Sequence, residues 1–357
     1  MKNKKSKITI GLIVVVAVLA AIFLAVSGKP AKAQAKSAPV LSFYGNVDAG
    51  VQKYDSGIES LMRASEGGLS TSRLGFKGTS PDLGGINFNF NLEGGLKPQT
   101  GTLGSTTTTG QVFTREATVS VAGSAGEIKL GTTDVSNATE TDTASWQFGN
   151  FTNFPVNGAA IEIGGDASNV IKYISPVFNG LQVQAGYAGN SSTATTDARA
   201  DIRSGSINYV MGAAKLGVGY ATKQATTSVG ETDAKSIGGS YDFGKLSVGA
   251  AYVYGDNSTT ANVKSTANVY SVRVPMEAGL ALHGVYAQAK DGAQTTANDG
   301  TGYTVGLTKT FAPGANVYAA YSRVTNDANS TMYLNGMTAP SAGKDPSLMT
   351  VGINYAF

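Results

Sequence analysis

Residues 348–357 alternate strictly between apolar and small or polar side chains. The apolar set is Met349, Val351, Ile353, Tyr355 and Phe357, and the residues between them are Thr350, Gly352, Asn354 and Ala356. A period of two is typical of a β-strand with one apolar face. Such a strand needs a hydrogen-bonding partner and a cover for its apolar face, and a transmembrane barrel supplies both. The alternative is a strand of an ordinary β-sandwich.

The same alternation recurs along the chain, with few helical signals between the segments. In residues 86–93, for example, Ile86, Phe88, Phe90 and Leu92 alternate with three asparagines and Glu93. Each segment has about ten residues, which is long enough to cross a bilayer when the strand is tilted. Membrane crossing by strands is therefore the interpretation that the pattern favours.

The connections between these segments differ in length. Short connections such as 80–85 and 312–314 alternate with long polar ones such as 53–69, 134–167 and 326–345. Their number predicts about sixteen strands, the size class of barrels that enclose an aqueous channel. An even number of strands puts both ends of the barrel on the same side, so Phe357 is expected to pair with the strand that starts at Val40. We therefore predict an all-β fold, an antiparallel transmembrane β-barrel with short periplasmic turns and long external loops.

Residues 1–33 have the features of an export signal. Four lysines among the first seven residues precede an apolar run over 8–26, and the small-x-small sequence of 31–33 is typical of a cleavage site. We expect a signal peptide at 1–33 and a barrel domain at 34–357. The alternative is an uncleaved membrane anchor, because the run is just long enough to span a bilayer.

Composition limits the remaining functions. The chain has 27 Lys and Arg and 24 Asp and Glu. Six of the basic residues and none of the acidic ones lie within 1–33, so the mature chain carries a net charge of −3. This balance gives no reason to expect nucleic acid as a partner. The chain has no cysteine and a single histidine, His283, so thiolate and multi-histidine metal sites are excluded and no cofactor is expected.

Four segments resemble the general porins of Gram-negative bacteria, in particular their β-proteobacterial branch. These are residues 42–48 (SFYGNVD), 72–79 (SRLGFKGT), 169–176 (NVIKYISP) and 355–357 (YAF). The resemblance implies a homotrimeric diffusion porin of the outer membrane, with sixteen strands and a third loop folded into the channel. It also implies outer-membrane lipid, lipopolysaccharide and the barrel assembly machinery as partners. Small hydrophilic solutes and ions would pass through the channel. Tyr355 and Phe357 would form the assembly signal.

The alternation places candidate channel residues on the lumen side. Leu74 and Phe76 are expected to face lipid, so Arg73 and Lys77 should face the lumen, because a cation on the lipid face would cost about 2–4 kcal/mol at mid-membrane. The resemblance implies a ladder of basic side chains opposite acids of the third loop. Its candidate members are Arg73, Lys77, Arg115 and Lys172 on the wall, and Glu140 and Asp142 on the loop. Arg115 shares the apolar parity of its strand, so it needs a bulge or a position at the rim to turn inward.

Three functions are compatible with this sequence. The first is a passive, water-filled pore with selectivity set by charges at a constriction. The second is a barrel with an adhesive or structural role carried by its long loops. The third is a barrel hydrolase, which would have to use His283 as its base. We expect the first, and we do not expect an enzyme.

Overall fold

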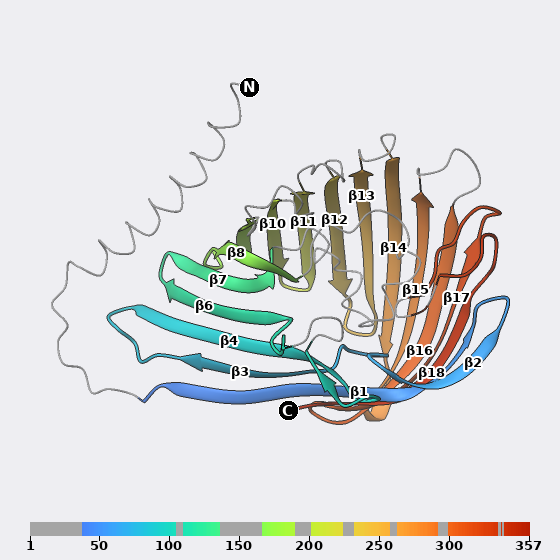
Figure 1. Cartoon of the computed structure of the whole chain (residues 1–357), viewed down its shortest axis with the longest axis horizontal. Helices are drawn as coiled ribbons and strands as arrows, with labels where there is room; N and C mark the ends of the chain where they lie inside the picture. The colour runs from blue at the N-terminus through green and yellow to red at the C-terminus, as the bar shows by residue number, and fades with distance from the viewer. Residues whose placement is uncertain are drawn as a thin grey trace.

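The computed structural model describes residues 38–104, 110–135, 166–189, 201–223, 232–257, 263–291, 299–334, 337 and 339–357. Almost every described segment contributes to one antiparallel sheet (Figure 1). Its first strands are β1 (Val40–Asp55), β2 (Ser60–Glu66), β3 (Arg73–Thr79), β4 (Ile86–Lys97), β5 (Thr102–Leu103), β6 (Glu116–Gly123), β7 (Gly126–Asp134), β8 (Asp166–Ile174) and β9 (Leu181–Ala188). The others are β10 (Ile202–Met211), β11 (Ala214–Lys223), β12 (Thr232–Asp242), β13 (Ser247–Asn257), β14 (Val263–Pro275), β15 (Leu280–Asp291), β16 (Gly300–Ala312), β17 (Ala315–Asn326) and β18 (Ser347–Ala356).

These eighteen strands make a closed barrel with sixteen strand positions. β2 and β3 both pair with β1 and occupy one position, and the two-residue β5 pairs only with the end of β4. β18 pairs with β1 and closes the sheet. The predicted sixteen-stranded antiparallel barrel is therefore confirmed. No helix in the described parts of the chain is long and apolar enough to cross a bilayer.

The short turns lie where the sequence placed them. β3 ends at Thr79 and β4 begins at Ile86, while β16 ends at Ala312 and β17 begins at Ala315. The long connection expected at 53–69 differs, because most of it is strand. β1 and β2 form a hairpin around residues 56–59, with Lys53 opposite Met62. This hairpin extends toward the rim, so polar residues can face outward there. The two strands still pair through their backbone hydrogen bonds, although the apolar alternation has weakened.

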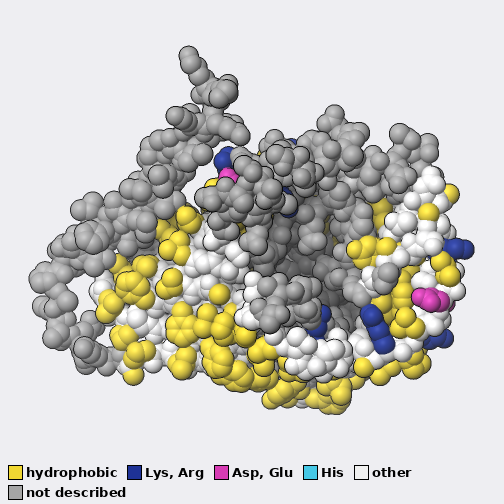
Figure 2. Space-filling model, in the orientation of Figure 1, with side chains coloured by type: hydrophobic (Ala, Val, Ile, Leu, Met, Phe, Trp, Pro, Cys, Tyr) yellow, Lys and Arg dark blue, Asp and Glu magenta, His cyan; other side chains and the backbone are white. Residues whose placement is uncertain are grey.

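Side chains alternate between an apolar outer face and a mostly small or polar inner face. In β1, Phe43 and Val51 are each 54% exposed on the outer face, whereas Asn46, Asp48 and Gln52 on the other parity are buried. Figure 2 shows hydrophobic side chains gathered on the outside, over the part of the barrel that contains β1, β3 and β4, beside a hollow. Lipid can cover such an outer face without any loss of backbone hydrogen bonds.

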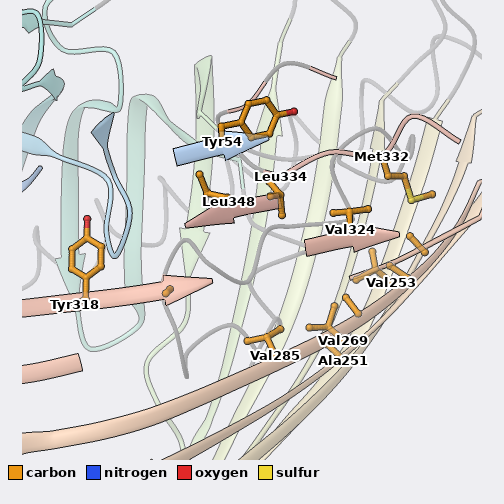
Figure 3. Packing of buried hydrophobic residues seen from close by; sticks show 14 residues of the cluster. Tyr54, Ala251, Val253, Val269, Val285, Tyr318, Val324, Met332, Leu334 and Leu348 are labelled. Atoms are coloured by element: carbon orange, nitrogen blue, oxygen red, sulfur yellow. The ribbon is translucent and has the colours of Figure 1, made fainter. Parts of the chain in front are cut away.

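The connection between β17 and β18 folds against the inner wall. Met332 and Leu334 of this connection are each 2% exposed and pack with Val324 and other inner-face residues (Figure 3). Asn326 fixes the entry of the loop, since its Nδ2 donates to the carbonyls of Met332 and Lys344 at 2.9 and 2.7 Å. The infolded third loop expected from the resemblance lies largely outside the described residues.

A buried carboxylate holds the break between β2 and β3. Asp48 is fully buried, and its oxygens accept hydrogen bonds from the backbone N–H groups of Gly68, Leu69 and Ser70 at 3.0–3.1 Å. Tyr318 donates to it at 2.6 Å from β17. We call Asp48 and the residues 67–72 that it anchors the Asp48 latch. Position 68 has no room for a side chain, because a Cβ there would lie 2.3 Å from the Tyr318 hydroxyl oxygen.

Candidate functional site: charges on the inner wall

The register of the first strands brings ionisable side chains together on the inner wall. Tyr44 of β1 lies opposite Gly75 of β3, Gly75 lies opposite Glu93 of β4, and Glu93 lies opposite Glu116 of β6. Because directly opposite residues of an antiparallel sheet point to the same face, these side chains share the lumen side. Two carboxylates and their basic partners thus meet in one region of the wall.

Glu93 is the centre of the first group. Arg115 Nε donates to its Oε1 at 2.8 Å, and Arg73 Nε lies 3.6 Å from its Oε2. The Tyr44 hydroxyl lies 2.9 Å from the same Oε2. The Glu93 side chain is 13% exposed, whereas each arginine side chain is 34% exposed. Two guanidinium groups share one carboxylate, so this group keeps a net positive charge that faces the lumen.

The first group depends on the glycine at position 75, which has no side chain. A Cβ on Gly75 would lie 2.5 Å from Cζ of Tyr44, closer than real Cβ contacts come. The Tyr44 ring therefore lies across Gly75, which brings its hydroxyl to Glu93. Lys77 Nζ lies 5.1 Å from the centroid of the same ring, within the range of a cation–π interaction.

Glu116 is the centre of the second group. It accepts hydrogen bonds from Lys129 Nζ at 2.8 Å, Asn91 Nδ2 at 2.7 Å and Thr118 Oγ1 at 2.9 Å. Lys129 and Glu116 are each about one-fifth exposed. The two charges compensate each other, and the amide of Asn91 links this group to the Tyr44 hydroxyl at 2.8 Å.

Lys172 belongs to a separate, buried pair. Its Nζ donates to Oδ1 of Asp134 at 2.7 Å, and its side chain is 6% exposed against 25% for Asp134. Lys172 lies opposite Lys129 in the register of β7 and β8. Burial and the paired carboxylate both reduce the positive field that Lys172 can project into the lumen.

The predicted basic residues therefore separate by environment. Arg73, Lys77 and Arg115 come together around Tyr44 and Glu93, and Lys172 does not join them. Arg115 precedes β6 rather than lying in the strand, and its N–H donates to the carbonyl of Glu93 at 3.1 Å. Because Arg115 lies before the strand begins, its side chain does not have to follow the alternation of β6 and can turn toward the lumen. The predicted loop acids Glu140 and Asp142 lie outside the described residues.

Three charged residues of the Glu93 and Glu116 groups were missing from the predicted site, namely Glu93, Glu116 and Lys129. The alternation did contain a signal for Glu93, because it follows three asparagines on the polar parity of its strand. The residues that pair with it were not predictable, because the partners depend on the register between strands. We call Arg73, Lys77, Glu93, Arg115, Glu116 and Lys129 the inner-wall charge cluster.

The predicted pairing of the C-terminal aromatic with the first strand is confirmed. Phe357 and Gly45 exchange two backbone hydrogen bonds, each of 3.0 Å. The Phe357 ring lies 5.6 Å from the ring of Phe43 and 6.0 Å from that of Tyr355, measured between centroids. A Cβ at position 45 would lie 2.7 Å from the Phe357 ring, so glycine makes room for this contact.

His283, the residue that a hydrolase would need, lies on the inner face of β15. It is 6% exposed, and its Nε2 lies 2.9 Å from the hydroxyl of Thr308 on β16. Among the described residues, no group of three or more His, Cys, Asp or Glu side chains has the arrangement of a metal site.

Comparisons with known proteins agree with this architecture. The model of the Gram-negative porin family matches residues 14–329. Outer membrane porin protein 32 of Delftia acidovorans is 32% identical over 238 residues, which is 62% of this chain. The chain spans 65% of the length of that relative.

Solved structures share the barrel. The anion-selective porin from Comamonas acidovorans superposes with a TM-score of 0.76 at 25% identity, covering 89% of this chain and 100% of that one. OmpT of Vibrio cholerae in its trimer form has the same fold at 15% identity, with a TM-score of 0.65 and coverage of 90% and 100%. The family match covers most of the chain, and the chain therefore belongs to the Gram-negative porins, β-barrels of the outer membrane.

Proposed function

We propose that this porin is a passive, water-filled channel for small hydrophilic solutes and ions. The observation that carries the proposal is the closed barrel with an apolar outer face and a charge cluster on its inner wall. Sixteen strands enclose enough space for an aqueous path, and charges inside a narrow path act through a lower effective dielectric than in bulk water. No reaction and no energy coupling is needed for such passage.

The inner-wall charge cluster gives this channel a weak preference for anions. Arg73 and Arg115 share the single carboxylate of Glu93, whereas Lys129 and Glu116 balance each other. Lys77 adds a further positive charge, exposed above the Tyr44 ring. The solved Comamonas acidovorans porin is described as anion-selective, which is consistent with this sign.

Reconstitution in planar bilayers tests the proposal. Purified protein should produce discrete conductance steps, and a salt gradient should give a reversal potential on the anion side. Protein that inserts as a folded barrel but leaves the bilayer non-conducting would contradict the channel function. An adhesive or structural role would then be the better explanation.

We further propose a homotrimer that uses the outer faces of the first and last strands. Phe43, Val351 and Ile353 are each more than half exposed and lie on neighbouring strands, β1 and β18, while Val47 lies between them on the same face. Contact with outer-membrane lipid and lipopolysaccharide is the alternative role of these side chains. A monomeric mass in mild detergent would contradict the trimer.

Export and assembly complete the proposal. Residues 1–33 act as a signal peptide that is removed, and the assembly machinery reads Tyr355 and Phe357. The mass of the protein isolated from outer membranes tests the first point, because cleavage removes the whole apolar run of 8–26.

We also propose that His283 has no catalytic role. Its contact with Thr308 is that of a wall residue joining two neighbouring strands. Replacing His283 by glutamine should leave conductance unchanged, and any esterase or protease activity lost with this change would support an enzyme instead.

A further inference from the structure

The Asp48 latch ends directly beside a cation of the inner-wall charge cluster. Its residues 67–72 connect β2 to β3, and the next residue, Arg73, is the first of β3. Asp48 itself is fully buried, so it cannot touch a solute, whereas one-third of the Arg73 side chain is exposed. The latch therefore joins a buried carboxylate to a guanidinium that faces the lumen.

The carboxylate end of the latch is surrounded by hydrogen-bond donors. Besides the three backbone N–H groups of the latch, the Tyr318 hydroxyl donates to Asp48 at 2.6 Å and Asn354 Nδ2 donates at 3.2 Å. An ionised carboxylate accepts through both of its oxygens, whereas an asparagine at this position has one acceptor oxygen and an NH₂ group. With Asn at position 48, part of this set of donors would lose its acceptor.

Two paths connect the carboxylate to the carbonyl group of Thr71. The first is the backbone itself, because Ser70 donates its N–H to Asp48 and is followed directly by Thr71. The second consists of two buried amides. Asn354 Nδ2 also donates to Oδ1 of Asn46 at 2.8 Å, and Asn46 Nδ2 donates to the Thr71 carbonyl at 3.1 Å.

The Thr71 carbonyl is also the hydrogen-bond partner of the channel cation. Arg73 Nη1 donates to it at 3.2 Å. The other contact of this guanidinium is the 3.6 Å approach of Nε to Glu93, which is longer than a normal hydrogen bond. The direction of the Arg73 side chain thus depends on where the latch holds residue 71.

The backbone of β3 is held independently of the carboxylate. Ser72 Oγ accepts from the backbone N–H of Asp48 at 2.8 Å and donates to its carbonyl at 3.0 Å. These two bonds use only the main chain of residue 48, so they remain when its side chain is changed. The segment also borders a cavity of about 530 Å³, lined by Gly67, Thr71 and Ser72 and by residues 95–97 of β4. Residues 68–71 can therefore shift while β3 stays paired.

We propose that Asp48 is a positioning residue for the charge selectivity of the channel. Its ionised carboxylate holds residues 68–71, and the Thr71 carbonyl holds the Arg73 guanidinium in its place on the lumen wall. The inference rests on the proposed channel, because charge selectivity is a property of a conducting pore. It adds a residue that acts on passing ions only through Arg73.

The sign of the selectivity change in Asp48→Asn tests the proposal. Direct electrostatics predicts a shift toward anions, because the substitution removes a negative charge. Loss of the Arg73 position predicts the opposite. In planar bilayers with a salt gradient, the reversal potential should shift toward cations by at least about half of the shift in Arg73→Ala. A smaller shift, or a shift toward anions, would overturn the proposal.

A double-mutant cycle separates action through Arg73 from a general disturbance of the barrel. In the Arg73→Ala background, Asp48→Asn should give no further shift toward cations, because the residue it positions is absent. Additive shifts would contradict the positioning role. Asp55→Asn is the matched control, since it removes the same charge from an exposed position at the end of β1. It should leave selectivity unchanged.

A spectroscopic measurement follows the latch itself. The chain has no cysteine, so Ser70→Cys gives a single site for a nitroxide spin label in the mature protein. The label should be immobile with Asp48 and mobile with Asp48→Asn, while heat-modifiable migration shows that both barrels are folded. An unchanged line shape in a folded Asp48→Asn barrel would overturn the proposal.

A second variant covers the case in which Asp48→Asn does not fold. Asn46→Ala removes the amide path to the Thr71 carbonyl and leaves the carboxylate with its three N–H partners. It should also shift the reversal potential toward cations, and an unchanged potential would contradict the role of the latch.

The two proposals fail separately. A folded barrel that does not conduct would contradict the channel. A conducting barrel whose selectivity is the same with Asp48 and with Asp48→Asn would contradict only the positioning role.

Discussion

The basic side chains of the inner wall differ in how much charge they present to the lumen. Arg73 and Arg115 are about one-third exposed and share Glu93, whereas Lys172 is almost completely buried against Asp134. Residue type and strand parity selected Arg73 and Lys172 from the sequence, whereas Arg115 has the apolar parity of its strand and was included as a member of the basic ladder that the resemblance implies. Their exposure was not predictable, because it depends on partners contributed by neighbouring strands.

Arg73→Ala should shift the reversal potential in a salt gradient toward cations and raise conductance slightly. The substitution removes one of two guanidinium groups and leaves Glu93 paired with Arg115, so stability should change by less than about 1 kcal/mol. Measurements on single channels check both points. Arg323→Ala, an outward-facing position on β17 that pairs with Asp345, serves as the control and should leave selectivity unchanged.

Lys172→Ala should move selectivity in the same direction but mainly reduce stability. It would leave Asp134 without its ion-pair partner, and breaking a pair with one buried member costs about 2–3 kcal/mol. Denaturant unfolding of the detergent-solubilised protein measures this loss. An unchanged midpoint, together with a reversal potential that moves as far as in Arg73→Ala, would place Lys172 at the constriction after all.

At the scale of elements, the interruption between β2 and β3 is built around the Asp48 latch. The segment between the two strands makes no sheet pairing, and three of its backbone N–H groups donate to the Asp48 carboxylate instead. From the sequence, Asp48 was one of several polar residues on the inner parity of β1. Nothing in the local pattern marks it, because its partners lie 20 to 306 positions away.

Asp48→Ala should destabilise the barrel by about 3 kcal/mol and increase current noise. The change leaves the N–H groups of Gly68, Leu69 and Ser70 buried without their acceptor. Thermal unfolding and single-channel recordings measure the two effects. Asp55→Ala, an exposed carboxylate at the end of the same strand, should change the unfolding temperature little. Equal losses in both variants would mean that Asp48 contributes no more than a surface charge.

At the scale of the whole molecule, the sequence predicted the fold well and the site only in part. Period-two alternation and turn residues are local, so strand number and short turns could be read directly. The β1–β2 hairpin was missed because its outer segment no longer faces hydrocarbon and loses the apolar period. The partners of Glu93 and the infolding of Met332 and Leu334 depend on contacts between distant segments, which no local pattern contains.

Deletion of Phe357 should prevent normal assembly. It removes the residue that exchanges two hydrogen bonds with Gly45 and stacks its ring beside Phe43, while the rest of β18 stays intact. We expect periplasmic accumulation and loss of the heat-modifiable form in membrane fractions. Phe357→Tyr retains the aromatic ring and is the matched control. Normal amounts of folded protein after the deletion would contradict this role.

The partners of Asp48 also bear on the order of folding. Its carboxylate accepts hydrogen bonds from Tyr318 of β17 and Asn354 of β18, and also from backbone N–H groups of the segment between β2 and β3. Before β18 pairs with β1, the Asp48 carboxylate lacks the hydrogen bonds from the last two strands. Moving it out of water at that stage would bury a charge without enough hydrogen-bond donors, which is strongly unfavourable. A partly formed barrel thus gains little by inserting its first strand deeply, and seam closure and insertion become one cooperative event.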